Sequence, residues 1–213
     1  MSQISLPLEW HGDRQGGGDF LVSDANRIAV AHLERWREWP LSVSILTGPP
    51  RSGRSALGRQ FTAMSGGTVV DPAQGQDERA LFHAWNEAQT ARRPLLMIGD
   101  APPASWAVAL PDLRSRLAAA PYVAIAEPDE PLARALLARH FDRAGAAYAA
   151  DLPDWLVRRI ERRYGAIEAV ARLLDRAALS SGRKISIPMA KETLQDAGFL
   201  PIVPPDSSTP QRE

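Results

Sequence analysis

Apolar and polar residues follow two different periods between residues 41 and 125. Short apolar runs predict strands, and segments with an apolar residue every three or four positions predict helices. The predicted strands are 41–47, 68–71, 95–98 and 122–125, and the helices between them are 53–64, 77–90 and 110–119. Strands that alternate with helices favour an α/β fold, with a small parallel sheet of about four strands covered on both faces.

A further helix precedes the first strand. Ser23 or Asp24 is a suitable N-cap, and the helix is expected to run to about Glu38, where Pro40 ends it. Its apolar positions include Ile28, Ala31 and Trp36.

The pattern after Glu127 is entirely helical. Helices are predicted up to about Ala144, from Asp151 through Ile160, over 166–180 and over 188–196. We therefore divide the chain into a flexible tail (1–20), an α/β core (21–127), a helical subdomain (128–200) and a disordered Pro/Ser-rich end (201–213).

Composition narrows the class of protein. The 213 residues contain 25 Lys and Arg against 25 Asp and Glu, so net charge gives no argument for nucleic acid or membrane binding. Cysteine is absent, which excludes disulfides and zinc–thiolate sites, and no structural metal is expected. No apolar run spans a bilayer and no signal segment is visible, so a cytoplasmic location is expected.

The first strand leads into a phosphate-binding loop pattern, G-x-x-x-x-G-K-[ST], with arginine in place of the lysine. Backbone N–H groups of such a loop, and the N-terminus of the helix behind it, can bind phosphate oxygens of ADP or ATP. An ordinary strand-to-helix turn is the alternative interpretation. The candidate nucleotide-binding residues in the loop are Gly48, Pro49, Pro50, Ser52, Gly53, Arg54 and Ser55.

Two carboxylates follow the later strands. Asp71 ends the second strand and, with the Ser55 hydroxyl, is a candidate ligand for Mg²⁺. Asp100 ends the third strand, next to the loop, and could sense a terminal phosphate or the attacking water. Each also fits a simpler role, because Asp71 starts an Asp-Pro turn and Asp100 is suited to cap the turn after it.

Arginines supply the other candidate chemistry. Arg114 and Arg116 lie on the predicted helix 110–119, and an arginine can enter a neighbour's phosphate site because it is always charged and binds in a forked geometry. Arg158, Arg159, Arg162 and Arg163 are predicted on one helical face, as an anionic-partner patch or simply a solvated surface. The four histidines have no metal-ligand spacing, and no catalytic triad context is present.

The N-terminal tail carries a short apolar peptide followed by a Gly-rich segment. Apolar side chains of such a peptide could fill a partner's pocket while its glutamine forms a hydrogen bond at the rim. Folding back onto its own domain is the alternative. The peptide consists of Gln3, Ile4, Ser5, Leu6, Pro7 and Leu8.

The tail, the loop and the segment 110–117 occur in the order seen in the Hda/HdaA family, and from Gln3 to about Ala197 the chain resembles these DnaA-related AAA+ regulators, particularly the alphaproteobacterial type. The resemblance implies a P-loop AAA+ three-layer core and an all-α lid. It also implies that residues 3–8 bind the sliding clamp (the β subunit of DNA polymerase III), and that Arg116 is an arginine finger supplied to ATP bound by DnaA.

On this reading the chain promotes ATP hydrolysis by DnaA and so limits replication initiation. It contacts DNA only through the clamp, while self-association is left open. The family's own nucleotide is ADP, and no efficient ATPase activity is expected here. Four features depart from the family pattern: Arg54, Pro72 after Asp71, the missing sensor 2 arginine near 164–166, and the absence of one β–α unit of the family core. An autonomous loader-type ATPase, a nucleotide-free adaptor paralogue and a DNA-binding module acting through the 158–163 arginines remain alternatives.

Overall fold

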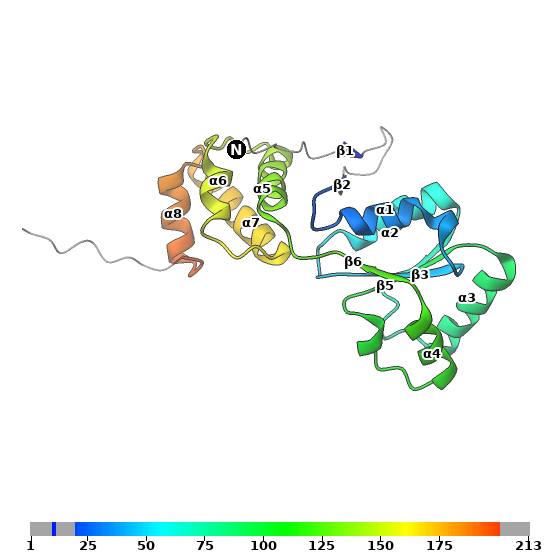
Figure 1. Cartoon of the computed structure of the whole chain (residues 1–213). Coiled ribbons are helices and arrows are strands. Elements are labelled where there is room, and N and C mark those ends of the chain that lie inside the picture. The colour runs from blue at the N-terminus through cyan, green and yellow to red at the C-terminus, as the bar shows by residue number, and fades with distance from the viewer. Residues whose placement is uncertain (1–9, 12–19, 201–213) are drawn as a thin grey trace, which may run out of the picture. The chain divides into compact units, whose positions relative to one another are not determined.

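The computed structural model describes residues 10–11 and 20–200 of the chain (Figure 1). Its contacts separate two compact units. The first contains the described residues up to Ala133 together with Arg162–Gly165, and the second contains Arg134–Glu161 and the residues from Ala166 onward. Each unit is described by itself below.

The first unit is built on a four-stranded sheet with the order β4-β5-β3-β6. The strands are β3 (Val43–Thr47), β4 (Thr68–Val70), β5 (Leu95–Gly99) and β6 (Tyr122–Ala124), and all their pairings are parallel. Every residue of β3 and β5 is buried, as expected for central strands covered on both faces. The structure thus confirms the predicted small parallel sheet.

Helices cover both faces of this sheet, giving three layers (Figure 1). One layer contains α1 (Arg27–Glu34) and α2 (Arg54–Ser65), and the other contains α3 (Glu78–Ala91) and α4 (Pro111–Ala119). Val43, Ile45 and Met97 belong to the core under α3 and α4, together with Trp85 and Leu113. The 3-10 turns η1 (Trp36–Glu38) and η2 (Pro103–Ser105) connect these elements.

The first helix differs from its prediction in both start and phase. Neither Ser23 nor Asp24 is the N-cap, because Asn26 occupies that position and binds back to the preceding turn through the Ser23 N–H and the Leu21 carbonyl. The buried face consists of Ala29, Val30 and Leu33, whereas Ile28 is 74% exposed. The helix also stops at Glu34, and η1 continues the chain.

A short antiparallel pair was not predicted. Strand β1 (Trp10–His11), inside the segment expected to be a flexible tail, pairs with β2 (Phe20–Leu21). Two-residue strands carry too few alternating positions to produce a sequence signal. The pair matters because Phe20 of β2 packs on Gly53 of the phosphate-loop region, as described below.

The helical region contains α5 (Glu130–Ala144), α6 (Leu152–Val157), α7 (Tyr164–Ser181) and α8 (Ile187–Asp196). Within the second unit, Leu137, Phe141, Leu156 and Leu174 are fully buried. In α7, the apolar residues Ile167, Val170 and Leu174 lie on the buried face of the helix.

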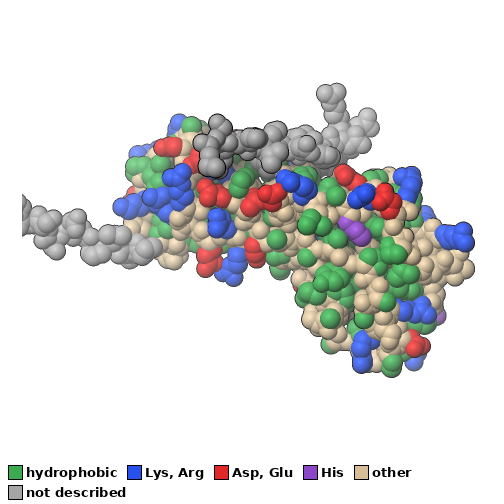
Figure 2. All heavy atoms as spheres, in the orientation of Figure 1, with side chains coloured by type: hydrophobic (Ala, Val, Ile, Leu, Met, Phe, Trp, Pro, Cys, Tyr) green, Lys and Arg blue, Asp and Glu red, His purple; other side chains and the backbone are tan. Residues whose placement is uncertain are grey.

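The predicted arginine face of residues 158–163 is wrong. Helix α6 ends at Val157, and the chain turns so that Ile160 and Tyr164 are both buried, which starts a separate helix at Tyr164. Arg159 folds over the Trp155 ring, at 4.5 Å from its centroid, and Arg162 lies 3.8 Å from Glu130. The four arginines therefore do not form one stripe on one helix. On the face shown in Figure 2, positive and negative side chains are interspersed.

Candidate functional site

The candidate phosphate loop lies at the carboxyl end of β3 and turns into α2. Gly53, the N-cap of α2, has φ +90°, a left-handed conformation that strongly favours glycine. A Cβ atom at Gly53 would also lie 2.7 Å from Cε2 of Phe20 in β2, so the Phe20 ring packs directly on this glycine. Sequence reasoning missed Phe20, because only the fold brings β2 to the loop.

Arg54, in the position where the loop pattern has lysine, is bound by its own chain. Its guanidinium donates to the Gly99 carbonyl and forms an ion pair with the Asp100 carboxylate. The Arg54 side chain is 13% exposed and the Asp100 side chain 65% exposed. The structure thus brings together two of the predicted site residues, and it pairs them with each other.

The other loop residues are arranged for contact with an anion. Ser52 is buried, and its hydroxyl has no hydrogen-bond partner among the described residues. Ser55 is exposed in the first turn of α2, where backbone N–H groups lack intrahelical partners. An unpaired buried hydroxyl is costly, and a phosphate oxygen would satisfy it. The loop therefore fits a phosphate group, apart from the neutralised charge of Arg54.

Asp71 follows β4 at the same edge of the sheet, two strands away from β3. The Asp71–Pro72 bond is cis, and Ala73 then donates to the Ile98 carbonyl of β5. Within residues 20–200 Asp71 makes no hydrogen bond or ion pair with the loop. If nucleotide binds, Ser55 and Asp71 are the residues that would hold Mg²⁺, which neutralises phosphate charge.

Arg116 of α4 lies on a different part of the first unit, against α3. Its guanidinium carbon is 4.4 Å from the centroid of the Phe82 ring, and its Nη1 donates to Oδ1 of Asn86 at 2.5 Å. Phe82 and Asn86 are one helical turn apart on α3, so they face α4 together. Both partners are neutral, and the charge of Arg116 remains available to an anion.

Arg114, the other candidate on α4, binds the backbone of the segment that precedes this helix. Its Nε and Nη2 donate to the Val108 carbonyl at 3.0 and 2.7 Å. Glu78, at the start of α3, accepts the Ala109 and Leu110 N–H groups at 2.7 and 2.6 Å. The segment that starts α4 is therefore held on its carbonyl side by Arg114 and on its N–H side by Glu78.

The region expected to carry a sensor 2 arginine contains a tyrosine contact instead. The Tyr164 hydroxyl donates to the Ala126 carbonyl at 3.1 Å. Burial raises the pKa of Tyr164 well above its usual value, and the nearby carboxylates of Glu127 and Asp129 raise it further. Tyr164 is thus neutral at physiological pH and cannot replace the missing cation.

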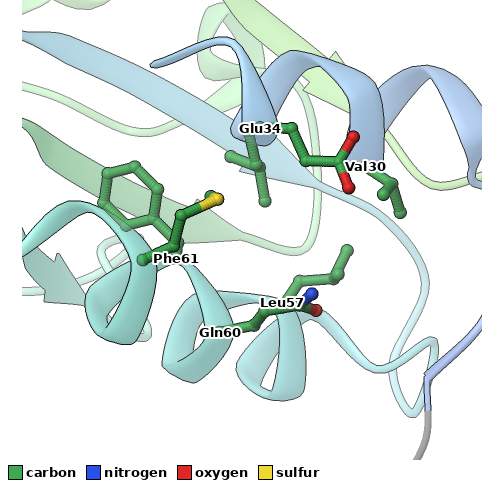
Figure 3. Close-up of a pocket in the computed structure, with 7 residues that line it drawn as sticks. Val30, Glu34, Leu57, Gln60 and Phe61 are labelled. Carbon is green, nitrogen blue, oxygen red and sulfur yellow. The ribbon is translucent and has the colours of Figure 1, made fainter. Parts of the chain in front are cut away.

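A small cavity between α1 and α2 is separate from the phosphate loop (Figure 3). Val30, Leu57 and Phe61 contribute apolar walls, and Glu34 and Gln60 line its polar side. Its volume of about 10 Å³ accommodates at most one water molecule. It is therefore not a ligand site.

Two further sequence predictions concern the N-terminal peptide and membrane-spanning segments. The peptide of residues 3–8 lies outside the described residues. None of the helices in the described ranges combines the length and the apolar character needed to cross a bilayer.

Comparison with known proteins bears on both units. Residues 130–194 match the family model described as "Hda, lid domain". Domain III of the Thermotoga maritima replication initiation protein DnaA is similar over 85% of this chain and 95% of that chain, with a TM-score of 0.69 and 13% identity. AMPPCP-bound DnaA from Aquifex aeolicus has a TM-score of 0.60 and 15% identity, covering 83% of this chain and 68% of that one.

A Thermotoga maritima RuvB variant is also similar, with a TM-score of 0.59 at 12% identity over 81% of this chain and 68% of that chain. Together with the three-layer sheet and the helical region that follows it, these similarities define the class: the chain has the AAA+ fold. Within that class, residues 130–194 are similar to the Hda lid domain, and the fold of the chain is similar to that of DnaA domain III.

Proposed function

We propose that this chain is a regulator of replication initiation of the alphaproteobacterial HdaA type. It binds the DNA-loaded sliding clamp through residues 3–8 and promotes hydrolysis of the ATP bound to DnaA. The single observation that carries this function is the state of Arg116, a cation held at the surface of α4 by a neutral ring and a neutral amide.

An arginine finger needs charge that its own chain has not neutralised. In phosphoryl transfer, a guanidinium supplied from a second protein stabilises negative charge that develops on the transferred group. Arg116 has this property, because its contacts with Phe82 and Asn86 orient the guanidinium without a carboxylate from the described part of the chain. The carbonyl partner of Arg114 is also neutral, but it occupies the Nε and Nη2 donors of that side chain, so Arg114 has fewer N–H groups left for a phosphate.

The chain's own nucleotide site has a different role in this proposal. ADP or ATP bound at the loop, with Mg²⁺, stabilises the fold and is not efficiently hydrolysed. The support is that Arg54 is paired with Asp100, and that no acidic residue follows Asp71 to orient a water. These features count against the alternative of an autonomous loader-type ATPase.

The DNA-binding alternative receives less support. It requires a continuous basic surface, because affinity for DNA comes largely from several phosphate contacts made together. The arginines of residues 158–163 are divided between a turn and the approach to α7, and Arg159 is stacked on Trp155. Contact with DNA through the clamp remains our proposal.

A reconstituted hydrolysis assay tests the function. DnaA loaded with labelled ATP is mixed with DNA-loaded clamp, with and without the full chain, and conversion of bound ATP to ADP is followed. We expect conversion only when all components are present. Equal conversion without the chain or without the clamp would contradict the proposal.

A further inference from the structure

We infer that Asp100 is an internal counter-ion of the phosphate loop, which competes with nucleotide phosphates for Arg54 and so sets a weak affinity for ADP. The inference rests on the proposed nucleotide site, but not on any action of Arg116.

The pair is well placed to act as a competitor. Arg54 is the loop's cation, and its largely buried guanidinium is bound by the Gly99 carbonyl and the Asp100 carboxylate. A phosphate that enters the loop must share this guanidinium with Asp100 or displace it. Because Asp100 carries the same sign of charge as the phosphate, its carboxylate also repels the incoming ligand.

The backbone that carries Asp100 is fixed next to the loop. A Cβ atom at Gly99 would lie 2.4 Å from Cζ2 of Trp106, so the indole packs on this strand end, and its Nε1 donates to the Ala101 carbonyl at 2.8 Å. The Asp100 N–H is held by Oε1 of Gln74 at 3.3 Å. These contacts present the carboxylate to Arg54 without an intervening mobile segment.

The competition is weak enough to be overcome. The Asp100 side chain is 65% exposed, so its carboxylate can turn to solvent with little desolvation cost. Because only Asp100 is exposed, we take the upper end of the range for exposed ion pairs, about 1 kcal/mol, which corresponds to an affinity change of about fivefold. Loss of repulsion between Asp100 and the phosphates adds to this change. Asp100 therefore lowers the affinity of the loop for phosphate but does not abolish binding.

The ion pair between Arg54 and Asp100 leaves a second polar group of the loop, the Ser52 hydroxyl, without a hydrogen-bond partner among the described residues. Ser52 is buried, and its Oγ lies 3.2 Å from the position that a Cβ of Gly48 would take. Asp100 thus neutralises the loop's cation while this second polar group stays unsatisfied within the described residues. In this inference a phosphate that enters the loop would pair with both groups.

Calorimetric titration of the full chain tests the inference. ADP and inorganic pyrophosphate are titrated in EDTA at fixed ionic strength, so that no metal bridges Asp100 to the phosphates. We expect Asp100→Asn to tighten binding of both by at least about fivefold. Asp112→Asn, the same charge change on the exposed surface of α4, should leave both affinities at the wild-type value.

Arg54 completes the test as a double-mutant cycle. In an Arg54→Gln background, Asp100→Asn should give a clearly smaller gain, because the cation it releases is absent. Unchanged or weaker binding by Asp100→Asn would overturn the inference and favour a sensor that supports the nucleotide. An equal gain in Asp112→Asn, or no measurable binding by either protein at the highest soluble ADP concentration, would also overturn it.

Thermal unfolding of each variant, measured without ligand, separates affinity from folding. The titration contains neither the clamp nor DnaA. Its failure therefore leaves the role of Arg116 standing, and failure of the hydrolysis assay leaves the competition by Asp100 standing.

Discussion

The guanidinium of Arg116 lies 4.4 Å from the centre of the Phe82 ring and donates to Asn86 at 2.5 Å. Arg54, at the phosphate loop, is instead paired with the carboxylate of Asp100. The positive charge of Arg116 is therefore not neutralised by its contacts, whereas that of Arg54 is neutralised by a carboxylate. This difference is the physical reason for proposing that the chain acts on a partner's nucleotide.

Removal of the Phe82 ring should lower the stimulation of DnaA. A cation–π contact at an exposed site contributes about 0.5–1 kcal/mol, so Phe82→Leu should reduce the maximal rate by roughly two- to fivefold. The hydrolysis assay at saturating chain concentration measures this effect. His83→Leu, a change to the adjacent exposed residue, is the control, and an equal loss there would show that Phe82 has no particular role.

Glu78→Ala should destabilise the first unit. The change removes the acceptor of the Ala109 and Leu110 N–H groups, which are not buried, so the loss should be that of ordinary hydrogen bonds, about 0.5–1.5 kcal/mol. Urea unfolding measures the difference in unfolding free energy. Glu87→Ala, at an exposed position of the same helix, is the matched control and should unfold like the wild type. Wild-type stability of Glu78→Ala would argue against this carboxylate holding the start of α4.

Stability should fall in mild acid because of His32. Burial lowers the pKa of His32 below 6.5, its Nε2 lies 2.7 Å from the Ser44 hydroxyl, and its ring stacks on Trp39. Between the folded and unfolded pKa values the unfolded chain binds more protons. The stability contributed by neutral His32 is therefore fully present above about pH 6.5 and is lost as pH falls below it.

Urea unfolding at several pH values from neutral to mildly acidic checks this dependence. The wild type should lose at most about 1.4 kcal/mol per pH unit from this one group. His32→Gln should have a flatter profile in the same interval, even if it is less stable at neutral pH. Parallel profiles for the two proteins would exclude His32 as the cause.

Binding to the clamp should depend on the N-terminal peptide. Gln3→Ala combined with Leu6→Ala removes both the polar anchor and an apolar side chain, and should abolish retention of the chain on immobilised clamp. Ser2→Ala, just outside the peptide, should bind like the wild type. Undiminished retention of the double variant would remove residues 3–8 from the mechanism.

The sequence predicted the regular elements well, because their signals are local. The apolar runs of β3 and β5 are buried along their whole length, and α3 (Glu78–Ala91) agrees closely with the helix predicted over 77–90. The resemblance also indicated the AAA+ fold and the lid correctly.

Features that depend on packing between distant segments could not be predicted. Ile28 is a helical apolar residue, yet it is exposed because α1 packs through the face that carries Ala29, Val30 and Leu33. The turn after Val157 follows from burial of Ile160 and Tyr164, and it divides the expected arginine face. The pairing of Arg54 with Asp100 joins residues far apart in the sequence, so no local pattern contains it.

Replacement of Arg116 is the most direct test of the central claim. In the assay with DNA-loaded clamp, Arg116→Ala should reduce ATP hydrolysis by DnaA by about 10³-fold or more, as expected for a finger supplied in trans, while retention on the clamp stays unchanged. Arg114→Ala, on the same helix, should keep most of the stimulation. Full stimulation by Arg116→Ala would contradict the account.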